Sequence, residues 1–376
     1  MIKGIDLTLL FGPGVPVPAP AGVIEALQSV TIEENSGQTP SGFDLSFAVD
    51  RDSPLVTAFL LSGAIEPLPI LRVALVATVS GQAIPLINGV VTSSDLSPGS
   101  GSEPATLTVR GTDLTAPMAH FDLAGIPYPA MPPEARVALI LAKYAWLGII
   151  PQVIPSLEGP PLPTDRIPRQ KGNDLDYIRT LADEAGYTFF LKPGPAPATS
   201  IAYWGPELRF GAPQPAITIE SGVPTNAESV SFSFNKDAVE LPVVYIQEPF
   251  TKATVPIPIP GAIPFHKPMG AIPPLPPKVV RLKDTARLNP FEALARGFAH
   301  AARKSDPVTG TAQIDVTRYG RIVRARSVIG VRGASRAYDG LHYVSSVRHQ
   351  LERGSYKQTL SLKRGGLLPT QATVPA

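Results

Sequence analysis

Residues 87–94 read Ile-Asn-Gly-Val-Val-Thr-Ser-Ser, and residues 338–346 read Tyr-Asp-Gly-Leu-His-Tyr-Val-Ser-Ser. In both stretches an Asn-Gly or Asp-Gly pair, at Gly89 and Gly340, leads into a strand-like run. Each of these two stretches is followed by a further segment, and the two following segments also resemble each other. Thr106–Gly111 begins 17 residues after Gly89 and Thr359–Gly365 begins 19 residues after Gly340, and both read Thr-Leu-x-apolar-basic before a glycine. The repeated order predicts two copies of one β-barrel in a single chain.

The residues around the first stretch are typical of strands. Residues 43–49 alternate between large apolar and smaller or polar side chains, the two-residue period of a half-buried strand. The run Ile70–Val79 is apolar except at Arg72, as in a strand covered on both faces. We interpret Asn88-Gly89 as a tight turn or a bulge. Residues 1–115 are expected to form the first tube-like β-barrel.

The middle of the chain has helical patterns. Pro132-Pro133 opens an Ala- and Leu-rich run, Glu134–Trp146, that Gly148 stops. A second helix is expected after Asn173, which can cap it, and before Gly186, which can end it. Residues 116–215 are therefore predicted to form a small α+β middle domain.

The second copy of the barrel is predicted in two pieces, residues 216–248 and 309–366. Between them, residues 249–308 should form an inserted arm and a helix, with Asn289 as the helix cap and Pro290 at its first position. Ten prolines among residues 249–277 indicate an extended segment that forms no strand ladder. Its apolar residues favour an ordered arm lying on a neighbour over a disordered linker. Residues 367–376 are expected to be a tail.

Composition narrows the class of protein. The 376 residues include 44 prolines and 32 glycines, which excludes a long-helix architecture, and 44% apolar residues, which permit a packed core. There is no cysteine, which excludes disulfides and thiolate zinc sites. The N-terminal residues lack the pattern of a signal peptide, and no apolar run is long enough to span a membrane. We expect a fold that is mainly β with minor α: two tube-like β-barrel domains, the middle domain and the Pro-rich arm.

Charge is divided unevenly along the chain. The net charge is +2, but residues 278–364 hold 18 Lys and Arg against 6 Asp and Glu, a balance of +12, and the rest of the chain carries −10. Such a basic end can dock on an acidic neighbour, remain solvated, or bind nucleic acid. Little aromatic interleaving occurs there beyond Tyr319, which argues against specific nucleic-acid binding.

Two motifs resemble those of contractile-tail hub proteins, a family that includes the phage late-control D proteins, the T4-type baseplate hub and the N-terminal part of VgrG proteins. One is the helical segment Gln170–Tyr187. The other is the ending that starts at Tyr338 and runs through Tyr356. Asn88-Gly89 fits a third, hairpin motif of the family. The matching positions are Asn88, Gly89, Asn173, Asp174, Leu175, Tyr177, Leu181, Gly186, Tyr187, Asp339, Gly340, Tyr343, Val344 and His349.

The resemblance implies a homotrimer in which three chains present six barrels and so adapt a threefold spike to the sixfold tail tube. No oligosaccharide-binding module or β-prism follows the hub motifs, so a separate spike protein is expected. Other implied partners are a tail-tube or tube-initiator protein and, around the hub, tape-measure and baseplate wedge proteins. Such a protein would assemble in the bacterial cytoplasm into a phage tail or phage-tail-like particle.

The sequence contains no recognisable catalytic, cofactor-binding or metal site. The five histidines lack metal-ligand or nucleophile-elbow spacing, and no Walker or dinucleotide glycine loop occurs. Adjacent carboxylates such as Glu33 and Glu34 face opposite sides of a strand. We expect no enzyme and no cofactor, and a structural role for His349.

Arginines near the C-terminal end and apolar residues of the Pro-rich arm are the candidates for an interface with another chain. Arg324 and Arg326 share a face if residues 322–331 form a strand, and they could then line a lumen or meet an acidic tube end. The candidate interface residues are Arg321, Arg324, Arg326, Arg332, Ile259 and Phe265.

Two other functions remain open from the sequence. A carbohydrate-binding cell-surface or tail β-domain protein would be a monomer with a shallow aromatic pocket. A peptidoglycan-cleaving baseplate enzyme would lose its activity on changing one carboxylate.

Overall fold

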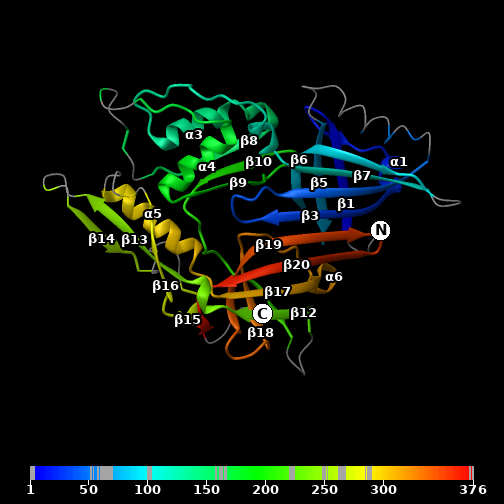
Figure 1. The fold of residues 1–376 in the computed structure, drawn as a ribbon. Coiled ribbons are helices and arrows are strands. Elements are labelled where there is room, and N and C mark those ends of the chain that lie inside the picture. The colour runs from blue at the N-terminus through cyan, green and yellow to red at the C-terminus, as the bar shows by residue number, and fades with distance from the viewer. Residues whose placement is uncertain are drawn as a thin grey trace.

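The computed structural model describes residues 5–50, 53, 55–56, 59, 71–99, 104–156, 159–160, 164, 167–219, 225–247, 251, 253–260, 268–283, 285, 290–371 and 374. The fold is mostly β, with 48% strand and 19% helix, which confirms the predicted class of a mainly β protein with minor α. Figure 1 shows the first β unit at the upper right and the second below it, with helices α3 (Pro133–Ala142), α4 (Asp174–Ala185) and α5 (Pro290–Arg303) to the left of the first unit.

The described part of the first β unit includes helix α1 (Ala21–Ala26) and the strands β1 to β7. Its strands are β1 (Ile5–Pro13), β2 (Val17–Pro18), β3 (Leu27–Asn35), β4 (Gly42–Val49), β5 (Leu71–Val79), β6 (Gln82–Ser97) and β7 (Ala105–Asp113). The alternation predicted for β4 is observed, with Phe43, Leu45, Phe47 and Val49 all buried in one core. Strand β5 is buried continuously from Arg72 to Ala77, as predicted for a strand covered on both faces.

The interpretation of Asn88-Gly89 as a tight turn is wrong. Both residues lie inside β6, and the turn that joins β5 to β6 is Ser80-Gly81, both with positive φ. The pairing register shifts near them at two places. One shift lies between Leu75 and Val76 in the β5–β6 pair, and the other lies between Val91 and Ser93 in the β6–β7 pair. The strand pairing therefore supports the alternative interpretation of a β-bulge, which lies at positions next to Asn88-Gly89 and not at the pair itself.

The middle unit has two helices against a three-stranded sheet with the order β8-β10-β9. These elements are α3 (Pro133–Ala142), β8 (Ile149–Val153), α4 (Asp174–Ala185), β9 (Thr188–Pro193) and β10 (Ser200–Gly205). Helix α3 is shorter than predicted, since a separate 3₁₀ turn follows at Ala145–Leu147. Helix α4 has the predicted ends: the Asn173 side chain caps it and Gly186 closes it with φ of 75°.

Among the described residues, the second β unit has six strands and helix α6 (Val316–Tyr319). Its strands are β11 (Gln214–Thr218), β12 (Ala227–Phe234), β17 (Val308–Asp315), β18 (Val328–Arg332), β19 (Gly340–Glu352) and β20 (Ser355–Arg364). The echo seen in the sequence corresponds to two antiparallel pairs, β6 with β7 and β19 with β20. The predicted strand over residues 322–331 exists only from Val328 onward.

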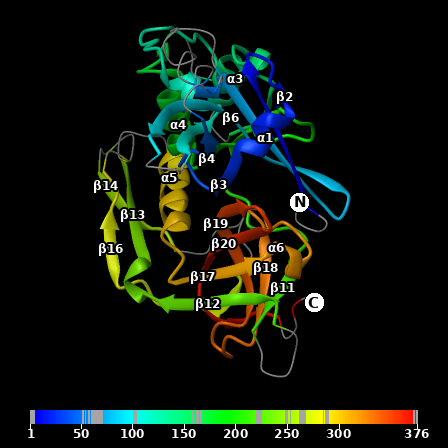
Figure 2. The same ribbon diagram turned by 90° about the vertical axis from the view of Figure 1, so that its right-hand side faces the viewer.

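One sheet runs through both β units. Its strand order is β12-β17-β20-β19-β3-β4-β7-β6-β5-β1-β2, with β18 and β11 attached beside β19. The junction is the antiparallel pair β3–β19, in register from Ser346 opposite Asn35 to Glu352 opposite Ser29. Figure 2 shows the second unit below the first, with β3 and β19 at their boundary. Among the described strands this pairing forms one open sheet.

The prediction that the Pro-rich segment forms no ladder is wrong for part of it. Strand β14 (Thr254–Pro258) pairs with β13 (Glu240–Gln247), which also pairs with β16 (Lys278–Arg281). Strand β15 (Gly270–Ile272) pairs with β21 (Leu367–Pro369), within the predicted tail. Pro256 and Pro258 are tolerated because β14 is an edge strand.

Helix α5 (Pro290–Arg303) packs on β13. Its small residues Ala293, Gly297 and Ala301 face Val244 and the segment after β14. The proposed cap Asn289 lies outside the described residues, whereas Pro290 begins the helix as predicted.

Candidate functional site

The junction between the two β units is held by a buried carboxylate. Glu34, on β3, is 3% exposed. Its Oε2 accepts a hydrogen bond of 2.9 Å from Arg324 Nε, and its Oε1 accepts one of 2.7 Å from Arg326 Nη2. Burial raises the pKa of Glu34, but the two guanidinium groups and His349 outweigh it and hold the pKa far below its usual range. The carboxylate is therefore ionised and paired with charges from the other β unit.

Arg324 and Arg326 lie in the loop before β18 and not on a strand face, which corrects the prediction of a shared strand face. Arg326 has φ of 66°, a left-handed conformation that turns the chain before β18. Both side chains reach back toward the first β unit. Arg324 donates to the Pro85 carbonyl at 2.5 Å, and Arg326 donates to the Asn35 carbonyl. Their guanidinium groups are engaged inside the chain, and the expectation that they line a lumen or meet a tube end stays a prediction.

His349 is buried in the same cluster. Its Nδ1 lies 2.8 Å from the Tyr356 hydroxyl, and its Nε2 lies 3.9 Å from Glu34 Oε2. Burial lowers the pKa of His349, so the ring is neutral at pH 7. These contacts lie inside the chain, and a structural role for His349 stays a prediction.

The middle unit meets the junction on one side. The Arg326 guanidinium carbon lies 4.3 Å from the centre of the Phe190 ring on β9. A second polar connection involves Arg72, which donates to Asn88 Oδ1 at 3.0 Å and to the Ala198 carbonyl at 2.8 Å. Asn88 in turn donates to Ser200 Oγ at 3.0 Å. Asn88 therefore joins β5 and β6 to β10.

Gly89 allows two strands and an aromatic ring to approach closely. A Cβ on Gly89 would lie 2.2 Å from the Thr112 carbonyl oxygen, and one on Gly111 would lie 2.2 Å from Cζ of Phe43. The Phe43 ring thus occupies space that side chains at both glycines would fill. This packing gives a physical reason for the two glycines in the repeated pattern.

The matching positions of the helical motif stabilise the middle unit. Leu175, Tyr177 and Leu181 are buried in its core. Asp174 is buried and ion-paired with Lys143 at 2.6 Å, and it accepts a hydrogen bond from Tyr144 at 2.7 Å. These contacts organise the first turn of α4.

Tyr187 lies beyond the other end of α4. Its hydroxyl donates to the Pro155 carbonyl at 2.7 Å, and its ring packs edge-on against Trp204, with 4.8 Å between ring centres. Together with the Gly186 cap, these contacts fix the exit from α4 into β9.

The C-terminal motif orders the start of β19. Asp339 Oδ1 accepts a hydrogen bond from the Ala334 amide at 2.9 Å, and Gly340 has φ of 115°. Tyr343 and Val344 are buried. The Arg209 guanidinium lies 4.9 Å from the centre of the Tyr343 ring, and it also pairs with Asp306 at 2.6 Å.

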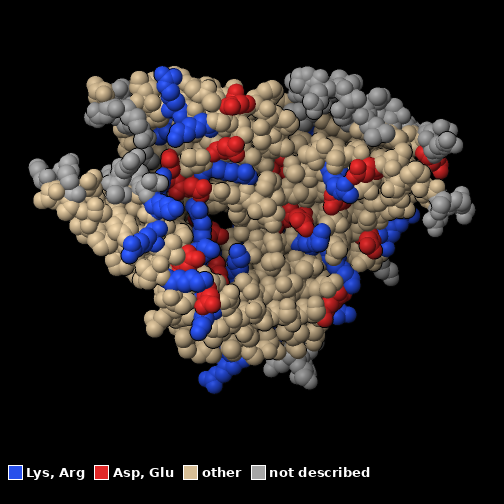
Figure 3. Space-filling model, in the orientation of Figure 1, with Lys and Arg blue, Asp and Glu red and all other residues tan. Residues whose placement is uncertain are grey.

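The remaining predicted interface residues fall in different places. Arg321 is exposed, and Arg332 donates to the Val374 carbonyl. Ile259 is only 2% exposed and packs in the core between β13 and α5, so the expectation that it contacts a neighbour is not supported. Phe265 lies outside the described residues. Figure 3 shows Lys and Arg intermingled with Asp and Glu on the face in view.

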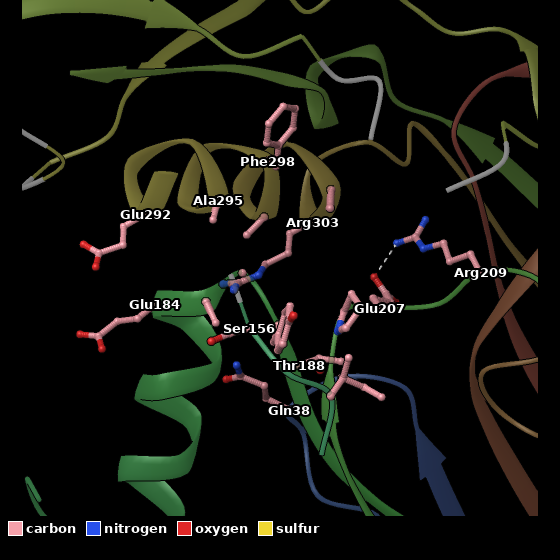
Figure 4. Close-up of a pocket in the computed structure, with 18 of the residues that line it drawn as sticks. Gln38, Ser156, Glu184, Thr188, Glu207, Arg209, Glu292, Ala295, Phe298 and Arg303 are labelled. Atoms are coloured by element: carbon pink, nitrogen blue, oxygen red, sulfur yellow. Dashed lines mark hydrogen bonds and ion pairs between the residues drawn. The ribbon is translucent and has the colours of Figure 1, made fainter. Parts of the chain in front are cut away.

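A pocket of about 760 Å³ lies where the first β unit, the middle unit and α5 meet, and we call it the α5 pocket. Sequence reasoning missed it because its walls come from six separate segments. Figure 4 shows α5 above and the end of α4 at one side. The residues that line it are Ser36, Gly37, Gln38, Ile154, Pro155, Ser156, Glu184, Ala185, Gly186, Tyr187, Thr188, Pro206, Glu207, Arg209, Phe291, Glu292, Ala295, Phe298, Ala299, Ala302, Arg303 and Lys363.

Within the described ranges, no group of three or more His, Asp or Glu side chains is arranged to hold a metal ion. None of the helices described is both long and apolar enough to cross a bilayer.

Comparisons with known proteins identify the fold. No family model matches the sequence, and no curated protein matches it. Among solved structures, a tail protein from Neisseria meningitidis MC58 is similar with a TM-score of 0.63 and 15% identity, over 97% of this chain and 98% of that one. The 43 kDa tail protein of prophage MuSo2 from Shewanella oneidensis gives a TM-score of 0.59 and 12% identity, over 96% and 99%.

A third structure, the half-lidded PdpA-VgrG complex of Francisella, gives a TM-score of 0.56 and 10% identity, over all of this chain and 60% of that one. The three comparisons agree with the resemblance stated from the sequence motifs. At these identities they establish architecture alone. The chain has the fold shared by these phage tail proteins and VgrG.

Proposed function

We propose that this chain is the structural, non-enzymatic hub of a contractile phage tail or a phage-tail-like injection system. The observation that carries the proposal is the pair of echoing β units in one continuous sheet, fixed to each other through β3–β19 and the Glu34 cluster. A hub needs two such units per chain in a fixed relation, because three chains then present six units to a sixfold tube. The shared fold with tail proteins supports the same role.

In this proposal the two units act as tube-like barrels, at residues 1–115 and at residues 216–248 with 309–366. The middle unit, residues 116–215, and the arm with its helix, residues 249–308, brace them. The chain forms a homotrimer that seats a separate spike protein and provides the first ring for the tail tube, inside the baseplate with its wedge and tape-measure proteins. Sheet pairing between subunits and burial of apolar surface drive the assembly.

The experiment that tests this role measures binding to the tail-tube protein of the same particle. The purified chain and tube protein are mixed, and the mass of the complex is determined by light scattering. The proposal predicts a complex with three hub chains for each ring of six tube subunits. No complex, or one hub chain per tube subunit, would count against it.

A further inference from the structure

The two β units share one order of strands. The order is β3-β4-β7-β6 in the first unit and β12-β17-β20-β19 in the second, and every neighbouring pair is antiparallel. Strands β3 and β12 also shift register at the same point, between Leu27 and Ser29 on β3 and between Ala227 and Ser229 on β12. Strand β12 is therefore the equivalent of β3, and β6 is the equivalent of β19.

The register of pairing shows which residues are equivalent. A row of directly opposite residues crosses four strands in each unit: Val30, Leu45, Val109 and Ser94 in the first, and Val230, Ala312, Leu360 and Val347 in the second. The last residue of each row directly follows a register shift, which ends at Ser93 on β6 and at Ser346 on β19. Ser94 on β6 thus corresponds to Val347 on β19.

The chain uses one edge of each equivalent pair and leaves the other edge open. At the junction, β3 pairs with the part of β19 that follows its register shift, from Ser346 to Glu352. Among the described strands, β12 pairs only with β17, and residues 93–97 of β6 pair only with β7. Figure 2 shows β12 at the lower edge of the second unit. The two open edges are therefore the equivalents of the two edges that meet at the junction.

The open edges expose apolar side chains whose equivalents at the junction are buried. His349 on β19 is fully buried, whereas its equivalent on β6, Leu96, is 42% exposed. Glu34 on β3 is also buried, whereas its equivalent on β12, Phe234, is 39% exposed. Strand pairing covers these positions at the junction, and the open edges lack that cover.

Neither open edge carries the features that usually prevent pairing. Charged side chains and prolines commonly protect an exposed edge strand. Residues 229–234 of β12 read Ser-Val-Ser-Phe-Ser-Phe, with neither a charge nor a proline. Residues 92–97 of β6 carry one charge, at Asp95, and Arg110 on the neighbouring strand pairs with it. Such edges favour the addition of a strand from another chain.

We infer that, in the homotrimer, β12 of each chain pairs antiparallel with residues 93–97 of β6 in the next chain. The inference rests on the proposed trimer. A second copy is the occupant because its open edge repeats the register of the β3–β19 junction, which places Phe234 opposite Ser94 and Phe232 opposite Leu96. The contact uses two different edges of each subunit, and it closes into a ring when the rotation between subunits permits it. The sheet then continues through all six units.

Disulfide trapping tests the register, because the chain contains no cysteine. Ser97 and Ser231 are exposed, and the inferred register places them directly opposite each other. Opposite Cα atoms of antiparallel strands lie about 4.5–5.5 Å apart, which a disulfide can span. Two differently tagged chains, one with Ser97→Cys and one with Ser231→Cys, are co-expressed and mildly oxidised. A disulfide dimer that carries both tags is expected.

The control replaces Ser97→Cys by Thr8→Cys. Thr8 is exposed on β1, near the other end of the sheet, so this control also detects a ring that closes through that end. The cross-linked dimer should be severalfold more abundant with Ser97→Cys than with Thr8→Cys. Equal or greater cross-linking through Thr8→Cys would contradict the inferred pairing.

A charge on the open edge of β12 provides a second test. Phe234→Asp, at a side chain already in contact with solvent, should leave folding unchanged and shift the trimer toward monomer. Phe121→Asp is the matched control, because Phe121 is an exposed phenylalanine of the middle unit, outside the inferred contact. It should leave the trimer intact.

The mass of the uncross-linked chain is measured in parallel by light scattering. A trimer whose Ser97→Cys and Ser231→Cys chains cross-link no more than the control overturns this inference and leaves the hub function standing. A chain that remains monomeric overturns both. A Phe234→Asp trimer as stable as the wild type would also overturn the inference.

Discussion

The Glu34 carboxylate accepts a 2.7 Å hydrogen bond from the Arg326 guanidinium, across 292 positions of sequence and the boundary between two β units. Arg324 binds the same carboxylate, so one buried anion meets two cations. Together with the β3–β19 pairing, this cluster fixes how one unit lies against the other. A hub that presents two units per chain depends on that fixed relation.

Replacing Glu34 by Gln should strongly destabilise the protein. Removal of one partner from a buried ion pair costs about 3–5 kcal/mol, because the remaining charges stay buried and unpaired. Denaturant unfolding measures the loss. The adjacent Glu33 provides a matched control: it pairs with Arg348 at 3.2 Å, but its side chain is 53% exposed, so Glu33→Gln should change the free energy by about 1 kcal/mol or less. Equal effects of the two changes would contradict the assigned role of Glu34.

Stability should fall in two stages as the pH is lowered. Buried His342 has its pKa lowered to about 3 by burial and by the nearby Arg364, and burial also lowers the pKa of His349. Because the two histidines of the unfolded chain are protonated at a higher pH than those of the folded chain, their contribution to stability is complete above about pH 6.5. It declines as the pH falls toward their lowered pKa values in the folded protein. The lowered pKa of Glu34 adds a further loss below about pH 4.5.

Two variants can show which residue is responsible for each stage of the loss of stability. His342→Gln should reduce the slope of unfolding free energy between pH 6.5 and 4.5, and Glu34→Gln should reduce it below pH 4.5. Both are measured by denaturant unfolding across the pH range. A His342→Gln protein with the slope of the wild type would show that this ring does not titrate as described.

Asn88 should matter more than its strand position suggests. Its side chain receives a hydrogen bond from Arg72 and gives one to Ser200, so Asn88→Ala leaves buried polar groups unsatisfied in two units. The expected loss is about 1–3 kcal/mol in the free energy of unfolding. Thr92→Ala, at an exposed hydroxyl on the same strand, is the control and should cost little. A similar loss for both changes would argue against the bridging role.

Gly89 should not tolerate alanine. The added Cβ would overlap the Thr112 carbonyl at 2.2 Å, and the strands must move apart to admit it. The expected loss is about 1–3 kcal/mol or more by thermal or denaturant unfolding. Gly37→Ala is the control, since its Cβ would meet no atom within 4 Å and its φ is not positive. If Gly89→Ala were as stable as Gly37→Ala, the close approach of these strands would be in doubt.

Local signals predicted much of this fold, whereas contacts between distant residues had to be seen in the structure. Asn173 and Gly186 act on neighbouring backbone, so the limits of α4 could be predicted. The echo around Gly89 and Gly340 correctly indicated paired strands. The function of Arg324 and Arg326 could not be predicted, because their partner Glu34 lies about 290 residues away and their strand-like spacing falls in a turn.

The Pro-rich arm also shows that local signals could be predicted and contacts between distant residues could not. A high proline content predicted an extended chain, but only the pairing with β13 made residues 254–258 a strand, and only α5 buried Ile259. The α5 pocket arises from six segments that are separate in the sequence, so no single motif could indicate it.

The mass of the chain in solution tests the central claim most directly. Light scattering over a range of concentrations should give a species three times the 39.8 kDa of one chain. That result would agree with a hub that presents six β units. A single 39.8 kDa species at every concentration would contradict the account.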